Sequence, residues 1–341
     1  MRIATYNVEW FNALFDDAGR LQSDDRWSGR EDVTRREQIG ALVRVFTALD
    51  ADAVMVIEAP DENSRRHTVP ALEAFAAEAG IRARKALLGF KNNTEQEIAL
   101  LYDPDSLTVR HDPRGNGGRD SFAPRFDGTL RIDLDVDGTL DVVEFSKPPL
   151  ELACTSASGQ AFRLIGVHLK SKAPHGARGK EEINRIAIAN RRKQLAQSVW
   201  LRRRVEEHLK VGESLIVLGD MNDGPGLDEY EKLFRHSGVE VVMGREHEDS
   251  RLRLHDPHAE RVLSRHTVAA PTSARFFIPT EKCWLSALLD YIMVSDDLME
   301  DGPRWRIWHP FDDHDCYSDE VLREALLTAS DHFPVSMDIA L

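Results

Sequence analysis

Polar side chains able to bind metal or move protons recur at the ends of apolar, strand-like runs in this chain of 341 residues. They are Asn7 with Glu9, Glu58, His168, Asp220 with Asn222, Asp290, and Asp331 with His332. A strand end presents its side chain at the rim of a sheet on a rigid support, so several such groups are able to converge. We therefore expect one site, formed around one metal ion and one phosphate.

The pair Asp220 and Asn222 follows the apolar run at residues 215–218, within Gly219-Asp220-Met221-Asn222-Asp223-Gly224-Pro225. This composition is also typical of an ordinary turn. However, residues two apart at the end of a strand face the same way, which favours a role as ligands. Glu58 follows residues 53–57 in the same manner, with a helix-capping or surface carboxylate as the alternative.

His168 lies near the end of the apolar run at residues 164–169, and Lys170 and Lys172 follow it with period two. A lone histidine in such a run is often a core residue. The two lysines, however, are spaced to present both ammonium groups to the same anion. Asp331 and His332 have an Asx-type turn as their alternative interpretation, and Asp290 has the start of a strand.

Strand-like and helix-like segments alternate along the whole chain, which is typical of an α/β or α+β fold. Residues 3–8, 53–57 and 98–102 are predicted strands, separated by helices around residues 39–49 and 70–79, giving the order βαβαβ. Residues 111–128 are predicted to be a loop. A hairpin turning at Asp137-Gly138 is expected to join residues 130–136 to 140–145. Further strands are predicted at residues 162–169, 215–218, 289–294 and 335–339, with a helix at about 181–209. So many strands require two sheets, and we expect a single domain over residues 1–341.

The overall composition is that of a globular protein, with 42% hydrophobic and 30% charged residues. This excludes a fibrous or disordered chain, and no apolar run is long enough to span a membrane. The sequence runs from Met1 directly into a predicted strand, and Cys154, Cys283 and Cys316 lack metal-binding spacing. These features favour the cytoplasm.

Charge is unevenly distributed. The chain carries a net charge of -14, yet residues 163–210 contain 13 Lys and Arg against 4 Asp and Glu. A basic face of this kind attracts phosphate. The alternative is that the distal arginines are the solvated side of a long helix. These are Arg191, Arg192, Arg202, Arg203 and Arg204.

The ordered set of motifs resembles the endonuclease/exonuclease/phosphatase superfamily, whose fold is like that of deoxyribonuclease I. The motifs are Thr5-Tyr6-Asn7-Val8, Ile57-Glu58, Val167-His168-Leu169, Gly219-Asp220-Met221-Asn222, Leu289-Asp290-Tyr291-Ile292 and Ser330-Asp331-His332-Phe333-Pro334-Val335. The resemblance implies a four-layer α/β/β/α sandwich of two packed mixed β-sheets. It also implies in-line attack of an activated water on phosphorus.

The resemblance further implies roles for individual residues. Glu58 would be the principal Mg²⁺ ligand, with Asn7, Asp331 and Glu9 nearby, and Mn²⁺ would also suit these oxygen ligands. Asp220 and Asn222 would orient the water and a phosphoryl oxygen, or hold a second metal.

By the same resemblance, His332 would be the base, because a carboxylate such as Asp290 on one ring nitrogen leaves the other free. His168 would be the acid or electrophile, with Glu97 as its acidic partner.

The leading functional hypothesis is a Mg²⁺-dependent nuclease, with Lys170 and Lys172 binding nucleic acid beside Asn7 and Asn222. The alternative is a phosphatase or phosphodiesterase that acts on a small-molecule or lipid phosphate. A non-catalytic binding module is a third reading, disfavoured because every motif keeps its reactive side chain.

Overall fold

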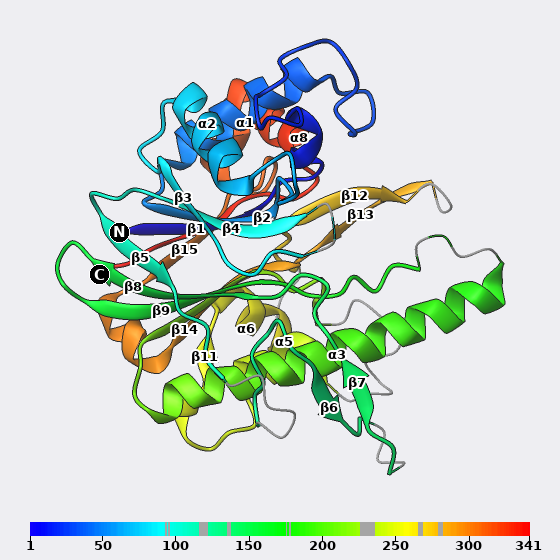
Figure 1. Cartoon of the computed structure of the whole chain (residues 1–341), viewed down its shortest axis with the longest axis vertical. Coiled ribbons are helices and arrows are strands. Elements are labelled where there is room, and N and C mark those ends of the chain that lie inside the picture. Colours follow the sequence, from blue (N-terminus) through cyan, green and yellow to red (C-terminus); the bar gives the residue numbers. More distant parts are fainter. Residues whose placement is uncertain are drawn as a thin grey trace.

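The computed structural model describes the whole chain except residues 93, 95, 116–121, 135–137, 175, 177–178, 226–235, 265–268 and 279–281. Two six-stranded mixed sheets pack face to face, and helices cover the outer face of each (Figure 1). The predicted α/β/β/α sandwich of two packed sheets is therefore confirmed.

The first sheet has the strand order β15-β16-β1-β2-β4-β3. Its strands are β1 (Arg2–Asn7), β2 (Ala53–Ala59), β3 (Lys85–Leu88), β4 (Glu97–Tyr102), β15 (Arg304–Ile307) and β16 (Val335–Asp338). Helices α1 (Arg35–Leu49), α2 (Thr68–Ala79) and α8 (Glu320–Ala329) cover its outer face, and the short α7 (His314–Ser318) precedes α8 (Figure 1). A capping box between Thr34 and Glu37 begins α1, and Gly80 in the left-handed region ends α2.

The second sheet has the order β11-β14-β10-β9-β8-β5. Its strands are β5 (Leu107–His111), β8 (Leu150–Ser156), β9 (Ala161–His168), β10 (Leu215–Asp220), β11 (Leu254–His255) and β14 (Asp290–Ser295). Helices α3 (Lys180–Lys210), α5 (Gly238–Met243) and α6 (Pro257–Leu263) lie on its outer face (Figure 1). Two separate hairpins are formed by β6 (Leu130–Ile132) with β7 (Asp141–Val143) and by β12 (Ala274–Ile278) with β13 (Cys283–Ala287).

The main core lies between the two sheets. Alternate residues of β1 and β2, such as Ile3 and Met55, meet Leu164 and Ile216 from the second sheet there. The other face of β1 packs against α1 through Tyr6 and its neighbours. The central strands are therefore apolar on both faces, which explains why continuous apolar runs in the sequence identified them.

Several sequence predictions need correction. The order βαβαβ is wrong, because β3 lies between α2 and β4. Strands β3, β5, β8, β11 and β15 and the hairpin β12–β13 were not predicted. Most of these are edge strands or stand apart from the sheets, with exposed positions that weaken the hydrophobic pattern. The predicted turn at Asp137-Gly138 includes a residue outside the described part of the chain.

The interpretation of the distal arginines as the solvated side of α3 is wrong for three of the five, while Arg192 and Arg203 are half-buried. Arg191, Arg202 and Arg204 are 1%, 6% and 0% exposed. Arg191 pairs with Asp223, Arg202 with Glu206, and Arg204 with Glu151 and Glu207. Much of the positive charge in this segment is therefore neutralised inside the protein. None of the described helices is long and apolar enough to cross a membrane.

Candidate active site

The predicted site residues meet at one edge of the sandwich, where β1, β2, β9 and β10 end. Within the second sheet, Asp220 on β10 is in register with His168 on one side and Asp290 on the other. In the first sheet, Asn7 ends β1 in register with Ile57, so Glu58 follows directly. Sheet pairing therefore aligns groups that are distant in sequence.

Asn7 and Asp220 connect the two sheets. The Asn7 side-chain amide donates to Asp220 Oδ2 at 3.0 Å, and the Ser330 hydroxyl donates to the Asn7 backbone carbonyl at 2.8 Å. Asn7 Oδ1 is buried and has no hydrogen-bond partner among the described residues. A buried amide oxygen of this kind is a candidate metal ligand, because an unsatisfied acceptor is otherwise costly.

Glu58 lies at a β-bulge of β2, with a φ of 63°. This left-handed conformation is unfavourable for a residue with a side chain, and such strain is common at functional sites. Burial raises the pKa of Glu58 to about 7, with Asp331 and Asp220 adding to the effect while Lys147 and His332 oppose it. The carboxylate thus lies within the field of both acidic neighbours, as a metal ligand would.

Asp290 and His332 form a buried dyad. His332 Nδ1 lies 2.8 Å from Asp290 Oδ2, which also accepts a hydrogen bond from the Ser273 hydroxyl at 2.8 Å. Although burial opposes the effect, Asp290, with Asp220 and Asp331, raises the pKa of His332 well above its ordinary value. The carboxylate thus fixes the ring orientation and leaves Nε2 available for chemistry.

His168 is placed beside Asp220, with Nε2 at 3.6 Å from Asp220 Oδ2. Burial, with Lys147 as a further cause, lowers the pKa of His168 well below its ordinary value. The prediction that Glu97 orients this histidine is wrong. His168 Nδ1 has no hydrogen-bond partner among the described residues, and Glu97 instead accepts from the side chain of Asn92 at 2.6 Å.

Asn222 holds Asp220 in place. Its backbone N–H donates to Asp220 Oδ1 at 2.7 Å, and its side-chain amide donates to Leu169 O at 3.0 Å. Asn222 has a φ of 48°, and the Gln194 side chain binds its carbonyl at 2.7 Å. Burial raises the pKa of Asp220 to about 7. The contact with Gln194 thus fixes the loop that carries Asn222 to α3.

Asp331 and Glu9 differ in whether a cationic side chain already binds the carboxylate. The Glu9 carboxylate is bound by the Arg30 guanidinium and by the Trp10 indole N–H, the latter at 3.1 Å. Burial and then Asp331 raise the pKa of Glu9, so the two carboxylates interact. Glu9 lies beside the cluster but is already ion-paired, whereas Asp331 has no ion-pair partner among the described residues.

Only one of the two lysines that the sequence singled out remains available at the site. Lys172 Nζ binds the buried carboxylate of Asp223 at 2.8 Å, so it supports the Asn222 loop. Lys170 remains at the site without an ion pair to any described carboxylate.

Lys147, which sequence reasoning missed, lies in the loop before β8. Burial lowers its pKa, although Glu58 and Asp220 oppose that shift, so its ammonium group lies among the catalytic candidates. Nothing in the spacing around Ser146-Lys147-Pro148-Pro149 indicates this placement.

The donor set fits a hard divalent cation. Asp220, Asp290 and His332 place one ligand atom each within 4.8 Å of one another, and Glu58, Asp331 and the unsatisfied Asn7 oxygen add further donors. Carboxylate and amide oxygens suit Mg²⁺ or Mn²⁺. Among these groups, Glu58 and Asp220 have raised pKa values, as expected where negative charge awaits a cation.

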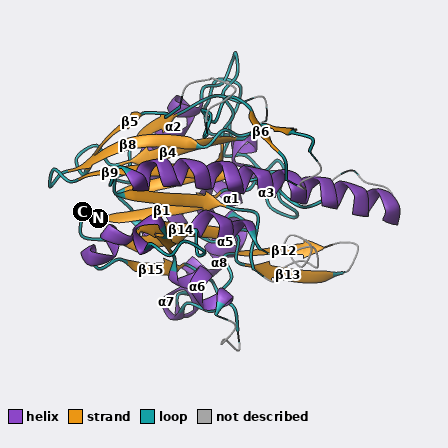
Figure 2. Cartoon of the chain, turned by 90° about the horizontal axis from the view of Figure 1, so that it is seen from below, coloured by secondary structure: helices purple, strands orange, loops and turns teal. Residues whose placement is uncertain are grey.

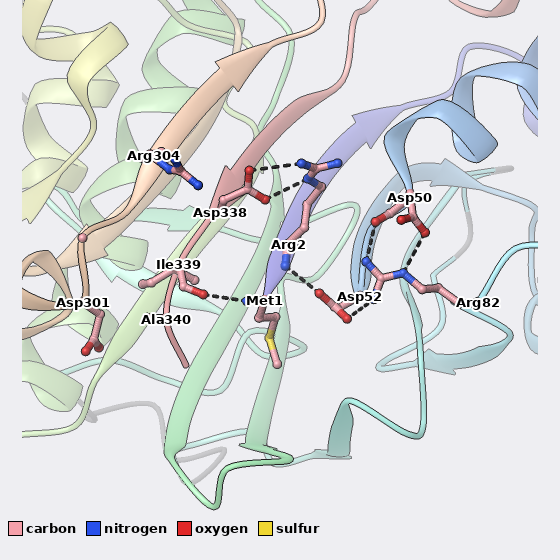
Figure 3. A pocket seen from close by; sticks show the side chains of 11 residues that line it. Met1, Arg2, Asp50, Asp52, Arg82, Asp301, Arg304, Asp338, Ile339 and Ala340 are labelled. Carbon is pink, nitrogen blue, oxygen red and sulfur yellow. Dashed lines mark hydrogen bonds and ion pairs between the residues drawn. The ribbon is translucent and has the colours of Figure 1, made fainter.

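A surface pocket of about 560 Å³ lies at the opposite end of β1, where Arg2 is in register with Asp338 (Figure 3). Its charged side chains largely bind one another: Arg2 Nε pairs with Asp338 at 2.8 Å, and Arg82 Nε with Asp50 at 2.8 Å. We assign this pocket no part in the chemistry at the strand ends.

Two packed mixed sheets with acidic, amide and imidazole groups at one edge are the arrangement of the deoxyribonuclease I-like fold. The chain belongs to the Endonuclease/Exonuclease/phosphatase family, which it matches over residues 4–332. A comparison with curated proteins finds no match.

Solved structures with the same fold include Caenorhabditis elegans TDP2, at 14% identity and a TM-score of 0.51, covering 100% of this chain and 74% of that one. A Bacteroides thetaiotaomicron mannosyl-6-phosphatase is 15% identical with a TM-score of 0.50, covering 100% of both chains. The human Nocturnin catalytic domain is 15% identical with a TM-score of 0.48, covering 100% of this chain and 94% of that one. At such identities the likeness to TDP2 and to the mannosyl-6-phosphatase shows the fold alone.

Proposed function

We propose that this family member is a Mg²⁺-dependent nuclease that cleaves a phosphodiester by in-line attack of water on phosphorus. The observation that carries the proposal is the His332–Asp290 dyad, 2.8 Å between nitrogen and oxygen, beside a cluster of carboxylates with unbalanced charge. A base and a cation site side by side are what water activation and phosphate binding require.

Each residue has a defined role in this proposal. Glu58, Asp331 and Asn7 would hold the metal, which supplies positive charge to stabilise the developing phosphorane. His332 Nε2 accepts the proton of the attacking water, while Asp290 holds the ring and stabilises the imidazolium that forms. Asp220 and Asn222 position the water and a phosphoryl oxygen.

His168 acts as an electrophile in this scheme. Burial and Lys147 keep the imidazole neutral, so it donates a hydrogen bond to a phosphoryl oxygen. Lys147 and Lys170 add positive charge for the same phosphate. Lys172, in contrast, acts through Asp223 as a positioning residue.

A phosphatase or phosphodiesterase for small or lipid phosphates is the second candidate. The internal pairing of Arg191, Arg202 and Arg204 favours it, because those charges do not form a long phosphate-binding track. The nuclease stays first because Lys170 and Arg275 have no carboxylate within ion-pairing distance among the described residues. A cytoplasmic location stays a prediction.

The test is hydrolysis by metal-stripped protein of a small diester, bis(p-nitrophenyl) phosphate, of p-nitrophenyl phosphate, and of single- and double-stranded DNA and RNA. We expect no turnover in excess chelator, recovery with Mg²⁺ or Mn²⁺, and cleavage of nucleic acid and diester far above that of the monoester. Full activity in chelator refutes the metal requirement, and preferential monoester hydrolysis selects the second candidate.

A matched pair of variants separates two of the predicted acidic ligands. Glu58→Gln should raise the Mg²⁺ concentration needed for half-maximal rate. Glu9→Gln should leave it unchanged, because Arg30 already occupies that carboxylate. Equal effects of both variants on metal dependence contradict the assignment.

A further inference from the structure

The hairpin β12–β13 projects beyond both sheets on the side where the strands carrying the site end (Figures 1 and 2). Its base is joined to the catalytic segment: Arg275 N donates to Asp331 O at 2.7 Å, and Phe333 N donates to Ser273 O at 2.6 Å. Ala274 also forms a bridge with His332. Any ligand on this hairpin therefore lies next to the reacting groups.

One face of the hairpin, together with Phe311 from the loop after β15, carries a row of flat side chains. The Arg275 guanidinium lies 4.5 Å from the ring centroid of Trp284 and 5.2 Å from that of Phe311, so it lies against both rings. The Phe277 ring follows at 5.5 Å from Trp284. We call these four residues, Arg275, Phe277, Trp284 and Phe311, the aromatic ladder. It runs outward from the backbone of Asp331.

The aromatic ladder is open to solvent and carries uncompensated charge. Trp284 is 58% exposed, Phe311 44% and Phe277 40%. Within the described residues, Arg275 has no carboxylate within ion-pairing distance, although the chain as a whole carries a net charge of -14. Exposed rings around an unpaired guanidinium, beside a phosphoester site, provide stacking surfaces and one anion contact.

We propose that the aromatic ladder binds unpaired bases of a single-stranded nucleic acid, next to the phosphate being cleaved, with Arg275 contacting a neighbouring backbone phosphate. This inference rests on the proposed nuclease function and names its substrate as single-stranded or frayed ends. Every base has a π-face, so rings and an arginine bind a strand without demanding a sequence. Paired bases in a duplex are already stacked on each other and leave the ladder unused.

A lipid surface is the other partner that exposed rings suit. It fits less well, because inserting this face into acyl chains would take the Arg275 charge out of water without a counter-ion. The Trp284 and Phe311 rings also lie against the Arg275 guanidinium. This alternation of rings and charge matches the alternating bases and phosphates of a strand better than it matches a fluid lipid surface.

The experiment measures binding and catalysis separately. Binding of a fluorescently labelled 12-nucleotide DNA strand is followed by anisotropy, with Mg²⁺ replaced by chelator to prevent cleavage. Catalysis is followed on that strand, on a blunt duplex of the same sequence, and on bis(p-nitrophenyl) phosphate, which has no neighbouring base or backbone phosphate. Trp284→Ala, Trp284→Phe and Arg275→Gln are compared with Leu285→Ala. Leu285 is 38% exposed on the opposite face of the hairpin, opposite Phe276.

Trp284→Ala should weaken strand binding about tenfold or more, since removing one stacking ring typically costs that much affinity. Trp284→Phe should retain most of the affinity, and Arg275→Gln should weaken binding and reduce its salt dependence. Turnover of the small diester should be unchanged in both Trp284 variants, and Leu285→Ala should match the parent on every substrate.

Four results overturn the inference, and the first three are strand affinity within twofold of the parent in Trp284→Ala, equal losses on strand and small diester, and no strand binding by the parent protein. If Trp284→Ala sediments less with phosphatidylcholine–phosphatidylserine vesicles than the parent does but binds the strand equally well, the inference is overturned in favour of a lipid surface. Trp284-dependent strand binding by a protein that hydrolyses only monoesters leaves the ladder in place and refutes the nuclease.

Discussion

Replacing Asp290 by Asn tests whether His332 works as a base held by a carboxylate. Asp290 is 1% exposed, so water does not replace the lost charge, and its Oδ2 accepts from both His332 and Ser273. If the Asn carbonyl keeps the hydrogen bonds from His332 and Ser273, its NH₂ group takes the position of Asp290 Oδ1, which has no partner among the described residues. An Asn flipped the other way faces the Nδ1–H and forces the wrong tautomer.

The expected loss of catalytic rate follows from losing the charge-assisted hydrogen bond between Asp290 and His332. A hydrogen bond to a charged group contributes about 1.5–3 kcal/mol, so kcat on bis(p-nitrophenyl) phosphate should fall about 10- to 100-fold. Because Asp290 raises the pKa of His332, the acid limb of the pH–rate profile should also shift to lower pH in the variant. The assay is the initial rate against pH at saturating Mg²⁺.

The alternative to exclude is that Asp290 is a metal ligand, since it lies with Asp220 and His332 in one possible ligand group. In that case higher Mg²⁺ would rescue Asp290→Asn, as we expect for Glu58→Gln. Asp256→Asn is the control for folding, because Asp256 is a buried aspartate that accepts hydrogen bonds from three backbone N–H groups. Near-parent kcat in a folded Asp290→Asn protein, or rescue by metal, refutes the reasoning.

Three further predictions concern the same edge of the sandwich. His332→Ala and Asp220→Ala should each lower kcat by at least ~10², the low end for a general base, and near-parent turnover with an unchanged circular dichroism spectrum contradicts their roles. Lys147→Ala should raise KM or lower kcat without loss of stability in urea. Lys172→Ala should instead lower the unfolding free energy by about 1–3 kcal/mol, because it removes a partner of a buried carboxylate; the reverse pattern contradicts both assignments. With about three phosphate contacts, KM for single-stranded DNA should rise about 20-fold between 50 and 200 mM salt, whereas a flat response selects a small substrate.

Local sequence determined much of the candidate site. Asn7, His168 and Asp220 end apolar strands, and the position of a residue at a strand end depends on a few neighbours. The same holds for α1 and α3, whose periodicity or length is visible in the chain. These features rest on short-range interactions, so pattern and spacing suffice to predict them.

Only the tertiary structure decided which charges are used at the site and which are buried. Lys170 and Lys172 look equivalent in the sequence, yet one stays at the site and the other binds Asp223. Lys147 enters the site from a loop with no distinguishing pattern, and Arg204 is neutralised by Glu151, more than fifty residues earlier in the chain.

The same distinction applies to the catalytic geometry. Asp290 and His332 are 42 residues apart in the chain and meet because β14 and the segment before β16 reach the same edge from different sheets. The hairpin β12–β13 that adjoins them has no hydrophobic pattern of its own to predict. Sequence periodicity reports which residues face a core, but pairing between charges depends on three-dimensional neighbours, and these are set by how the two sheets pack.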